Sequence, residues 1–304
     1  MSKKAFLFPG QGSQYVGMAQ DLYDNSAEAK EMIKTADNAL GINLSYILFS
    51  GPEEQLKQTE FTQPAIFLHS VILASIIRTL NAEAAAGHSL GEYSALVAAG
   101  SIQFFDAVKL VRARGVAMQK AGAQSKGTMA AIVGIDPKTV NECCAEASHE
   151  GIVQAANFNS PGQIVISGSV GGVKKAMEIC KSKGAKLVKE LVVSGAFHSP
   201  LMEPAKIELL NELNNTDIYD ARFPVYANVT AKPVFKKDEI KNLLYEQVTS
   251  PVRWEETILN MINDGIEEFY EIGPGKVLQG LVKRINPDVK CFGIDKYSDV
   301  EKYL

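Results

Sequence analysis

Several residue types that mark whole classes of protein are scarce in this chain. It has four cysteines and four histidines among 304 residues, without the C-x-x-C or Cys/His spacing of a metal site. The adjacent Cys143 and Cys144 fall on an expected helix, where we interpret them as packing residues. The net charge of −4 lacks the basic excess of nucleic-acid-binding proteins. We therefore expect no metal site and no nucleic-acid partner, and this cysteine usage fits a reducing cytoplasm.

Long apolar runs are also missing. The basic stretch 1–4 is followed by only four apolar residues, which is too short for a signal peptide. The apolar stretch 64–80 contains His69 and Arg78 and falls short of a membrane span. We expect it to form a buried helix that starts near Thr62, with His69 as a satisfied helix histidine. The sequence thus predicts a cytoplasmic protein without a membrane partner.

What the chain does have is length and apolar content. With 304 residues, 46% of them hydrophobic, it exceeds a typical single domain. Expected strands and helices alternate through 1–125 and 195–304, a pattern typical of an α/β sheet domain. Residues 126–194 follow the order strand, helix, strand, strand, helix, strand, which is a ferredoxin-like βαββαβ unit. We predict an α/β-hydrolase-like large domain with a parallel-rich sheet, formed by 1–125 and 195–304, and an inserted small domain at 126–194.

The segment 126–194 also differs from the rest in charge. It holds eight lysines, no arginine and six acidic residues, a net charge of +2, against −6 for the remainder. Six of these lysines fall between Lys174 and Lys189. They form either a solvated helix face or a weak docking patch for an acidic partner.

The stretch Gly87-His88-Ser89-Leu90-Gly91 matches G-x-S-x-G, in which a serine sits on a sharp strand-to-helix turn. Side chains two positions before and after the serine would crowd such a turn, so both are glycine. A helix at 90–99 would aim free N–H groups and its positive end at an oxyanion. Residues 82–86 are alanine-rich, and alanine favours helix, yet we expect a short buried strand there. So short a motif also arises by chance. For His88, next to the serine, two roles are open: a direct one in the reaction, or stabilisation of the turn.

A second candidate lies on the expected amphipathic helix 104–121. Its apolar face is predicted to contain Phe105, Val108, Val111 and Met118. Arg112 and Arg114 are two residues apart and point in different directions, so at most one can face the interior; either can instead be a solvated surface charge. Gly115 costs a helix about 1 kcal/mol relative to alanine, which suggests close approach of another group.

Two loops complete the set of candidates. His198 precedes Ser199, a suitable N-cap, and Pro200, suited to the first helical position. A helix N-terminus disfavours the imidazolium, so we expect a neutral ring able to accept a proton.

The glycine-rich loop 9–14 lacks the third glycine of a dinucleotide fingerprint and the Gly-Lys-Ser/Thr of a P-loop. We expect its glycines to serve close backbone approach.

In combination these motifs resemble the malonyl-CoA:acyl carrier protein transacylases of fatty-acid synthesis. They span nearly the whole chain in the order of that family. The matching stretches are Phe8–Gln14, Gly87–Ser94, Arg114-Gly115, Asn157–Gln163, Phe197–Ser199, Gln247 with Ser250–Val252, and Glu271–Lys276.

The resemblance implies a role for several positions. Ser89 would be the nucleophile and His198 its general base, with the backbone N–H groups of Gln11 and Leu90 as the oxyanion hole. Arg114 would hold the malonyl carboxylate. Further positions implied in the same way are Met118 and Phe197, which would line the acyl pocket, and Gln247, whose backbone carbonyl would orient the histidine. Asn157 and Asn159 receive no assigned role.

The implied reaction moves a malonyl group from malonyl-CoA to the phosphopantetheine thiol of a holo-acyl carrier protein through a malonyl-serine intermediate. Coenzyme A is then a substrate, and no cofactor is needed. Three alternatives stay open: a serine thioesterase or hydrolase, a trans-acting malonyl transferase of polyketide synthesis, and a catalytically silent carrier-binding module. The transacylase hypothesis requires that folding bring Ser89, Arg114 and His198 into one crevice.

Overall fold

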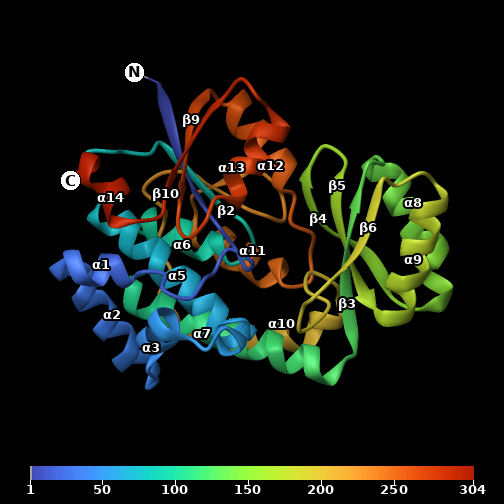
Figure 1. Cartoon of the computed structure of the whole chain (residues 1–304), viewed down its shortest axis with the longest axis horizontal. Coiled ribbons are helices and arrows are strands. Elements are labelled where there is room, and N and C mark those ends of the chain that lie inside the picture. Colours follow the sequence, from blue (N-terminus) through green and yellow to red (C-terminus); the bar gives the residue numbers. More distant parts are fainter. Residues whose placement is uncertain (1) are drawn as a thin grey trace.

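The computed structural model describes residues 2–304 and contains two separate β-sheets (Figure 1). The larger sheet has six strands in the order β10-β9-β1-β2-β7-β8. Neighbouring strands run parallel, except that β8 pairs antiparallel with β7 at one edge. The strands are β1 (Lys3–Phe8), β2 (Ala84–Gly87), β7 (Val225–Tyr226), β8 (Pro233–Val234), β9 (Ile266–Ile272) and β10 (Lys290–Ile294).

Helices cover both faces of this sheet, because the side chains of β1 alternate between two buried layers. Phe6 and Phe8 join the core cluster that contains the buried side chains of α5 and α7, whereas Ala5 and Leu7 join the cluster of α12 and α13. The helices of this large body are α1 (Gln20–Asn25), α2 (Ala27–Leu40), α3 (Leu44–Ser50), α4 (Glu53–Leu56), α5 (Thr59–Ile76), α6 (Gly91–Ala98), α7 (Phe104–Gln124), α10 (Glu203–Asn214), α11 (Lys237–Gln247), α12 (Trp254–Asn263), α13 (Val277–Ile285) and α14 (Tyr297–Val300).

The second sheet forms a small lobe at the right of Figure 1. Its elements are β3 (Gly127–Val133), α8 (Pro137–Ala147), β4 (Val153–Ser160), β5 (Gln163–Ser169), α9 (Val170–Ser182) and β6 (Leu187–Leu191). The strands are antiparallel in the order β4-β5-β3-β6, as the βαββαβ pattern predicts. The predicted fold class is confirmed. The domain boundaries at 125/126 and 194/195 stay a prediction, although all four strands lie between them.

The small lobe also has its own core. Cys143 and Cys144 are buried there among apolar side chains from both of its helices and its sheet, in agreement with the packing role expected for them. Within residues 2–304, none of the helices combines the length and the apolar composition needed to span a bilayer.

The long buried helix is found, and Thr62 lies near its start. Helix α5 begins at Thr59, continues through Pro64 and ends at Ile76 rather than at residue 80. A proline lacks the N–H that would bond to the carbonyl four residues earlier, here that of Glu60. The Arg112 guanidinium, from α7, donates to this carbonyl instead, and also pairs with the Glu60 carboxylate at 2.6 Å. A tertiary contact thus replaces the missing helical bond.

The expectation for Phe105 fails: it is 47% exposed rather than part of the apolar face of α7. Strand β7 is limited to Val225–Tyr226, because the chain then turns and Ala231 N–H donates to the Ala227 carbonyl. Helix α12 begins only at Trp254, because Val252 just before it exchanges two backbone hydrogen bonds with β4.

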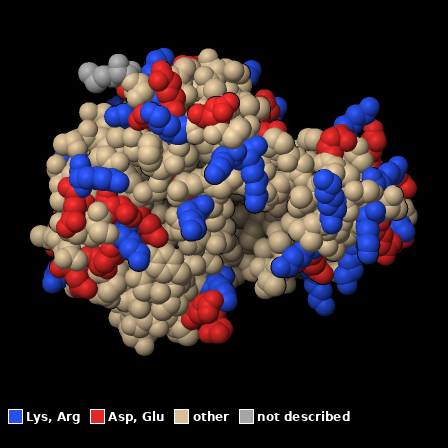
Figure 2. Space-filling model, turned by 45° about the horizontal axis from the view of Figure 1, so that its top comes forward, with Lys and Arg blue, Asp and Glu red and all other residues tan. Residues whose placement is uncertain are grey.

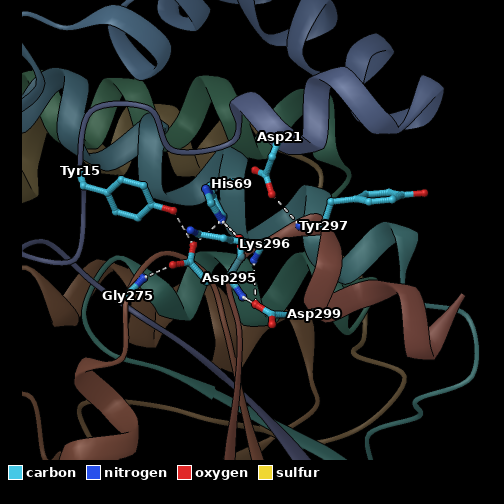
Figure 3. Close-up of polar contacts among 8 residues, drawn as sticks. All are labelled: Tyr15, Asp21, His69, Gly275, Asp295, Lys296, Tyr297 and Asp299. Atoms are coloured by element: carbon cyan, nitrogen blue, oxygen red, sulfur yellow. Dashed lines mark hydrogen bonds and ion pairs between the residues drawn. The ribbon is translucent and has the colours of Figure 1, made fainter.

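The C-terminal segment is tied to the N-terminal one by the side chain of Asp295 (Figure 3). Its carboxylate accepts from Tyr15 Oη at 2.9 Å and from Gly275 N at 3.1 Å. His69 Nε2, on α5, lies 2.8 Å from the Asp295 carbonyl oxygen. His69 is therefore a buried helix histidine with one satisfied nitrogen, while its Nδ1 has no partner among residues 2–304. This cluster anchors the loop after β1, which carries Gln11.

Candidate active site

The serine turn joins β2 to α6, and its two glycines are required by contact. A Cβ on Gly87 would overlap the backbone of Gly91, and a Cβ on Gly91 would overlap the carbonyl of Phe8 in β1. Ser89 itself has φ of 51°, in the left-handed region. Asn228 holds it there, because its Oδ1 accepts from Ser89 N at 2.6 Å and its Nδ2 donates to the Gly87 carbonyl at 2.6 Å. The alanine-rich strand before the turn is confirmed as β2, and all four of its residues are buried.

Ser89 and His198 form a hydrogen-bonded pair. The distance between Ser89 Oγ and His198 Nε2 is 2.8 Å. On the other side of the ring, Nδ1 lies 3.0 Å from the Gln247 carbonyl and 3.1 Å from the Ser250 carbonyl. Carbonyl oxygens only accept, so the proton of a neutral ring belongs on Nδ1. Nε2 is then free to accept the proton of the Ser89 hydroxyl.

The neutrality of this ring has a cause beyond the expected helix N-terminus. Ser199 does cap the following turn, accepting from Leu201 N, and that 3₁₀ turn, Pro200–Met202, leads directly into α10. Burial is the main cause, since His198 is 3% exposed, and the neighbouring Arg114 charge adds to it. Together they lower the pKa of His198 to about 3.

Arg114 reaches the same point from α7. It is 1% exposed, and its guanidinium donates to Gln63 Oε1 at 2.7 Å, to Gln247 Oε1 at 2.9 Å and to Ser89 Oγ at 3.2 Å. Burial lowers its pKa, yet arginine stays protonated in proteins. Arg112 points elsewhere, to Glu60, so only one of the two arginines faces the interior, in agreement with the limit set by their spacing.

Gly115, the neighbour of Arg114, has the close contact that its mid-helix position suggests. A Cβ there would lie 2.9 Å from the Thr59 carbonyl oxygen, at the start of α5. The glycine therefore lets α7 approach α5, and this approach places Arg114 beside Gln63. Ser89, Arg114 and His198 thus converge, because both other side chains contact Ser89 Oγ, but only Ser89 and His198 line the cavity described next.

A cavity of about 270 Å³ opens over this group, between the large body and the small lobe, where Figure 2 shows a hollow. Its lining includes Gln11, Ser89, Leu90, Met118, Phe197 and His198. Neither the Gln11 nor the Leu90 backbone N–H has an acceptor within residues 2–304. Both donors are thus available to a bound group, although their roles, like those of the other site residues, stay predictions.

The loop 9–14 shows the close approach expected of its glycines. A Cβ on Gly10 would lie 2.5 Å from the His88 carbonyl oxygen. His88 also lines the cavity, but its contacts are with other groups: its Nε2 lies 2.9 Å from Asn159 Oδ1 in the small lobe, and its ring packs near Trp254. His88 therefore supports the turn and joins it to β4.

Sequence reasoning missed several supporting residues. Gln63 accepts from the Arg114 guanidinium, and Asn228 accepts from Ser89 N. Gln154 Nε2 donates to the His198 carbonyl at 2.8 Å. One signal was available for Asn228, because a polar residue just past the end of a parallel strand lies at the ligand-binding edge of such a sheet. Nothing in the sequence marks Gln154, which acts from the inserted segment.

The lysines of the small lobe are exposed or half-buried, and Figure 2 shows basic side chains spread over that lobe. Three of them pair with acidic neighbours: Lys175 with Glu178 at 3.3 Å, and Lys138 with Glu142 and Lys183 with Glu146, each at 4.0 Å. Both interpretations of this cluster, solvated face and docking patch, remain open. Residues 2–304 contain no group of three or more His, Cys, Asp or Glu side chains arranged to hold a metal ion.

Comparison with known proteins gives a consistent result. A family model described as an acyl transferase domain matches residues 5–290. The chain is 46% identical over 304 residues to the malonyl CoA-acyl carrier protein transacylase of Bacillus subtilis, covering 99% of this chain and 96% of that protein. It superposes with a TM-score of 0.95 on an acyl carrier protein S-malonyltransferase from Vibrio cholerae, at 40% identity and 99% coverage of both chains.

A further solved structure includes a partner. It is a type II PKS acyl-carrier protein in complex with its malonyl-transacylase, with a TM-score of 0.96 and 38% identity to this chain. The alignment covers 100% of this chain and 99% of that transacylase.

Proposed function

This chain belongs to the acyl transferase family, among its malonyl-CoA:acyl carrier protein transacylases, and we propose on that basis how its own residues perform the reaction. The enzyme transfers the malonyl group of malonyl-CoA to an acyl carrier protein. The observation that carries the residue assignment is the meeting of three groups: Ser89 Oγ lies 2.8 Å from His198 Nε2 and 3.2 Å from the Arg114 guanidinium.

In the first half-reaction Ser89 attacks the thioester carbonyl of malonyl-CoA. A serine hydroxyl is a weak nucleophile near neutrality, and His198 Nε2 takes its proton as the C–O bond forms. The carbonyl oxygen becomes an oxyanion that accepts from the N–H groups of Gln11 and Leu90, each worth about 3 kcal/mol in such a site. The C–S bond then breaks, and His198 returns the proton to the coenzyme A thiolate.

The second half-reaction reverses these steps with another thiol. The phosphopantetheine thiol of the holo-carrier protein gives its proton to His198 and attacks the malonyl-serine ester. The Ser89 oxygen leaves and regains its proton from His198. Each half-reaction conserves protons, and the mechanism is ping-pong because coenzyme A departs before the carrier thiol reacts.

Arg114 supplies the selectivity for malonyl. Its guanidinium stays charged and can bind a carboxylate with two parallel hydrogen bonds. Met118 and Phe197 line the cavity beside it, and the bulk of Phe197 leaves little room for a branch on the acyl carbon. A hydrolase of plain fatty acyl groups would gain nothing from a buried arginine here, which favours the transferase over the hydrolase alternative.

The cellular setting belongs to the same proposal. The product, malonyl-acyl carrier protein, supplies fatty-acid elongation, and the enzyme acts in the cytoplasm. The reaction requires no cofactor, since coenzyme A enters only as the thioester substrate and the three side chains supply the acid-base and electrostatic chemistry.

The decisive experiment is intact-protein mass spectrometry after mixing with malonyl-CoA. The wild type should gain one malonyl adduct, which holo-carrier protein then removes, whereas Ser89→Ala should gain none. A wild type that releases free malonate without carrier protein would instead be a hydrolase. A wild type that never becomes acylated would be a silent carrier-binding module.

The role of Arg114 predicts a selective defect. Arg114→Ala should lower the rate of Ser89 acylation by malonyl-CoA at least about a hundredfold more than that by acetyl-CoA, because only malonyl presents a carboxylate to the guanidinium. Single-turnover acylation with each donor measures both rates. Equal losses on the two donors would refute the carboxylate contact.

A further inference from the structure

One buried carboxylate beside the site has no part in the reaction described so far. Glu92 lies on α6, one turn after Ser89, and is 3% exposed. A single oxygen, Oε2, accepts from Asn228 N at 3.0 Å and from Gln247 Nε2 at 2.7 Å. Burying a carboxylate is costly unless its environment compensates, so the position of this group calls for a functional reason.

The nearby Arg114 presents the opposite charge without a direct ion pair. Within residues 2–304 no carboxylate oxygen lies within 4.0 Å of its guanidinium nitrogens. Its hydrogen bonds go to two amide oxygens and to Ser89 Oγ, and its Nε has no acceptor in the same part of the chain. Both buried charges therefore depend on neutral groups between them.

The Gln247 side chain is the group that joins them. Its Oε1 accepts from Arg114 at 2.9 Å, while its Nε2 donates to Glu92 at 2.7 Å and to the Ser89 carbonyl at 3.0 Å. Only one orientation of this amide is compatible with its neighbours. A flipped amide would set its NH₂ against the guanidinium donors and its oxygen against the carboxylate and the carbonyl.

We propose that Glu92 is a positioning residue for malonyl selectivity, which acts through the Gln247 amide to hold the Arg114 guanidinium beside Ser89. In its carboxylate form Glu92 can only accept hydrogen bonds, so it favours the amide orientation that turns the Gln247 oxygen toward Arg114. Without this acceptor the Gln247 NH₂ keeps only the Ser89 carbonyl, and the guanidinium loses part of the support that holds it beside Ser89. The inference rests on the proposed function.

The test compares the rates at which malonyl-CoA and acetyl-CoA acylate Ser89. Two donors are needed because Glu92 also contacts Asn228 and so supports the serine turn. Damage to the turn slows acylation by malonyl-CoA and acetyl-CoA alike, whereas displacement of Arg114 slows malonyl-CoA alone. The ratio of the two single-turnover acylation rates therefore isolates the effect on Arg114. In Glu92→Leu this ratio should fall at least about tenfold.

Rescue and epistasis distinguish positioning from general damage. Glu92→Gln is isosteric, and its amide oxygen can accept both hydrogen bonds, so it should keep the ratio within about threefold of the wild type. In an Arg114→Ala background, Glu92→Leu should leave the ratio unchanged, because the group it acts on is gone. If Glu92→Leu does not fold, Glu92→Asp replaces it; its shorter side chain cannot reach Gln247, and the ratio should fall at least about threefold.

Glu271→Leu is the matched control. Glu271 is also a buried carboxylate and accepts from the backbone N–H groups of Leu278 and Gln279, but it does not contact Gln247 or Arg114. Its replacement should not change the ratio.

The proposal is overturned if Glu92→Leu or Glu92→Asp lowers both rates equally, if Glu92→Gln is as defective as Glu92→Leu, or if Glu92→Leu still lowers the ratio in the Arg114→Ala background. A wild type that malonyl-CoA does not acylate would instead refute the proposed function.

Discussion

The two residues proposed to exchange the proton, Ser89 and His198, are both held in an uncommon backbone conformation. Ser89 has φ of 51° and His198 has φ of 58°, a region that costs a residue other than glycine about 1 kcal/mol or more. Each is held by a side chain from elsewhere: Asn228 bonds to the backbone N–H of Ser89, and Gln154 donates to the carbonyl of His198. The surrounding structure therefore stores this strain and fixes the pair before any substrate arrives.

The lowered pKa of His198 predicts that the rate of Ser89 acylation changes little as the pH falls below neutrality. Protonation of Nε2 would remove the proton acceptor, so activity is lost only as the pH falls through the folded-state pKa of about 3. From about pH 7 to about pH 5, acylation by acetyl-CoA should change less than about threefold, whereas a histidine with the ordinary pKa of about 6.5 would lose more than about tenfold. Stopped-flow acylation over this range measures it.

Several charged or titratable groups adjoin this ring or its hydrogen-bonding partners. Arg114 from α7 stays charged throughout, and burial lowers the pKa of His88 from the serine turn. Burial raises the pKa of Glu92, from α6, to about 7. Glu92→Gln removes that titration and serves as the control, in which the profile should be equally flat. A tenfold fall centred near pH 6.5 in both proteins would show that His198 titrates normally.

At the scale of elements, contacts between helices decide where the charged groups point. Helix α7 lies against the start of α5 because Gly115 has no side chain, and Arg112 supplies the donor that Pro64 removes from α5. These contacts fix the rotation and depth of α7. Arg114 is consequently directed at Ser89, while Arg112, two residues earlier, is directed at Glu60.

Gly115→Ala should destabilise the protein despite the better helix propensity of alanine. The added Cβ would lie 2.9 Å from the Thr59 carbonyl oxygen, backbone that cannot yield without moving α7. We expect a loss of about 1–3 kcal/mol in the free energy of unfolding, measured by urea denaturation, together with slower acylation by malonyl-CoA.

Gly280→Ala provides the matched control in another helix. Gly280 is exposed on α13, and a Cβ there meets no atom within 4 Å. This variant should gain about 0.5–1 kcal/mol, the propensity difference alone. If Gly115→Ala were stabilised by the same amount, the close approach of the two helices would not constrain α7.

At the scale of the whole molecule, the small lobe takes part in the site that the large body builds. Its strand β4 exchanges backbone hydrogen bonds with Val252, close to the carbonyls that hold His198, and Asn159 bonds to His88. Gln154 completes the connection through the His198 carbonyl, at 2.8 Å, and the Thr249 carbonyl, at 3.4 Å. The lobe therefore does more than form one wall of the cavity.

Gln154→Leu should lower the rate of acylation by both donors about tenfold, because the backbone of His198 would lose a contact that sets its position. The free energy of unfolding should fall by only about 1 kcal/mol, the worth of one such hydrogen bond. Arg284→Ala is the control: Arg284 also bridges the lobes, by donating to Gln163, but does not contact His198, and this variant should retain the acylation rate. Equal rates in the wild type and Gln154→Leu would remove the lobe from the positioning of His198.

Local rules sufficed for much of this protein. The two glycines around Ser89, the alternation of strands and helices, and the βαββαβ order of the small lobe follow from steric fit and side-chain periodicity, which act over a few residues. The sequence therefore determined the fold class, the serine turn and, through the resemblance of its motifs, the set of residues that meet in the crevice.

Tertiary structure decided the rest, because the deciding contacts join residues far apart in the chain. Which arginine faces inward depends on how α7 packs on α5, and the neutral state of His198 comes from burial more than from the helix that follows it. Asn228 reaches Ser89 across 139 positions, and Glu92 reaches Gln247 across 155. No local pattern encodes such pairings; they exist only once the complete sheet has brought its strand ends together.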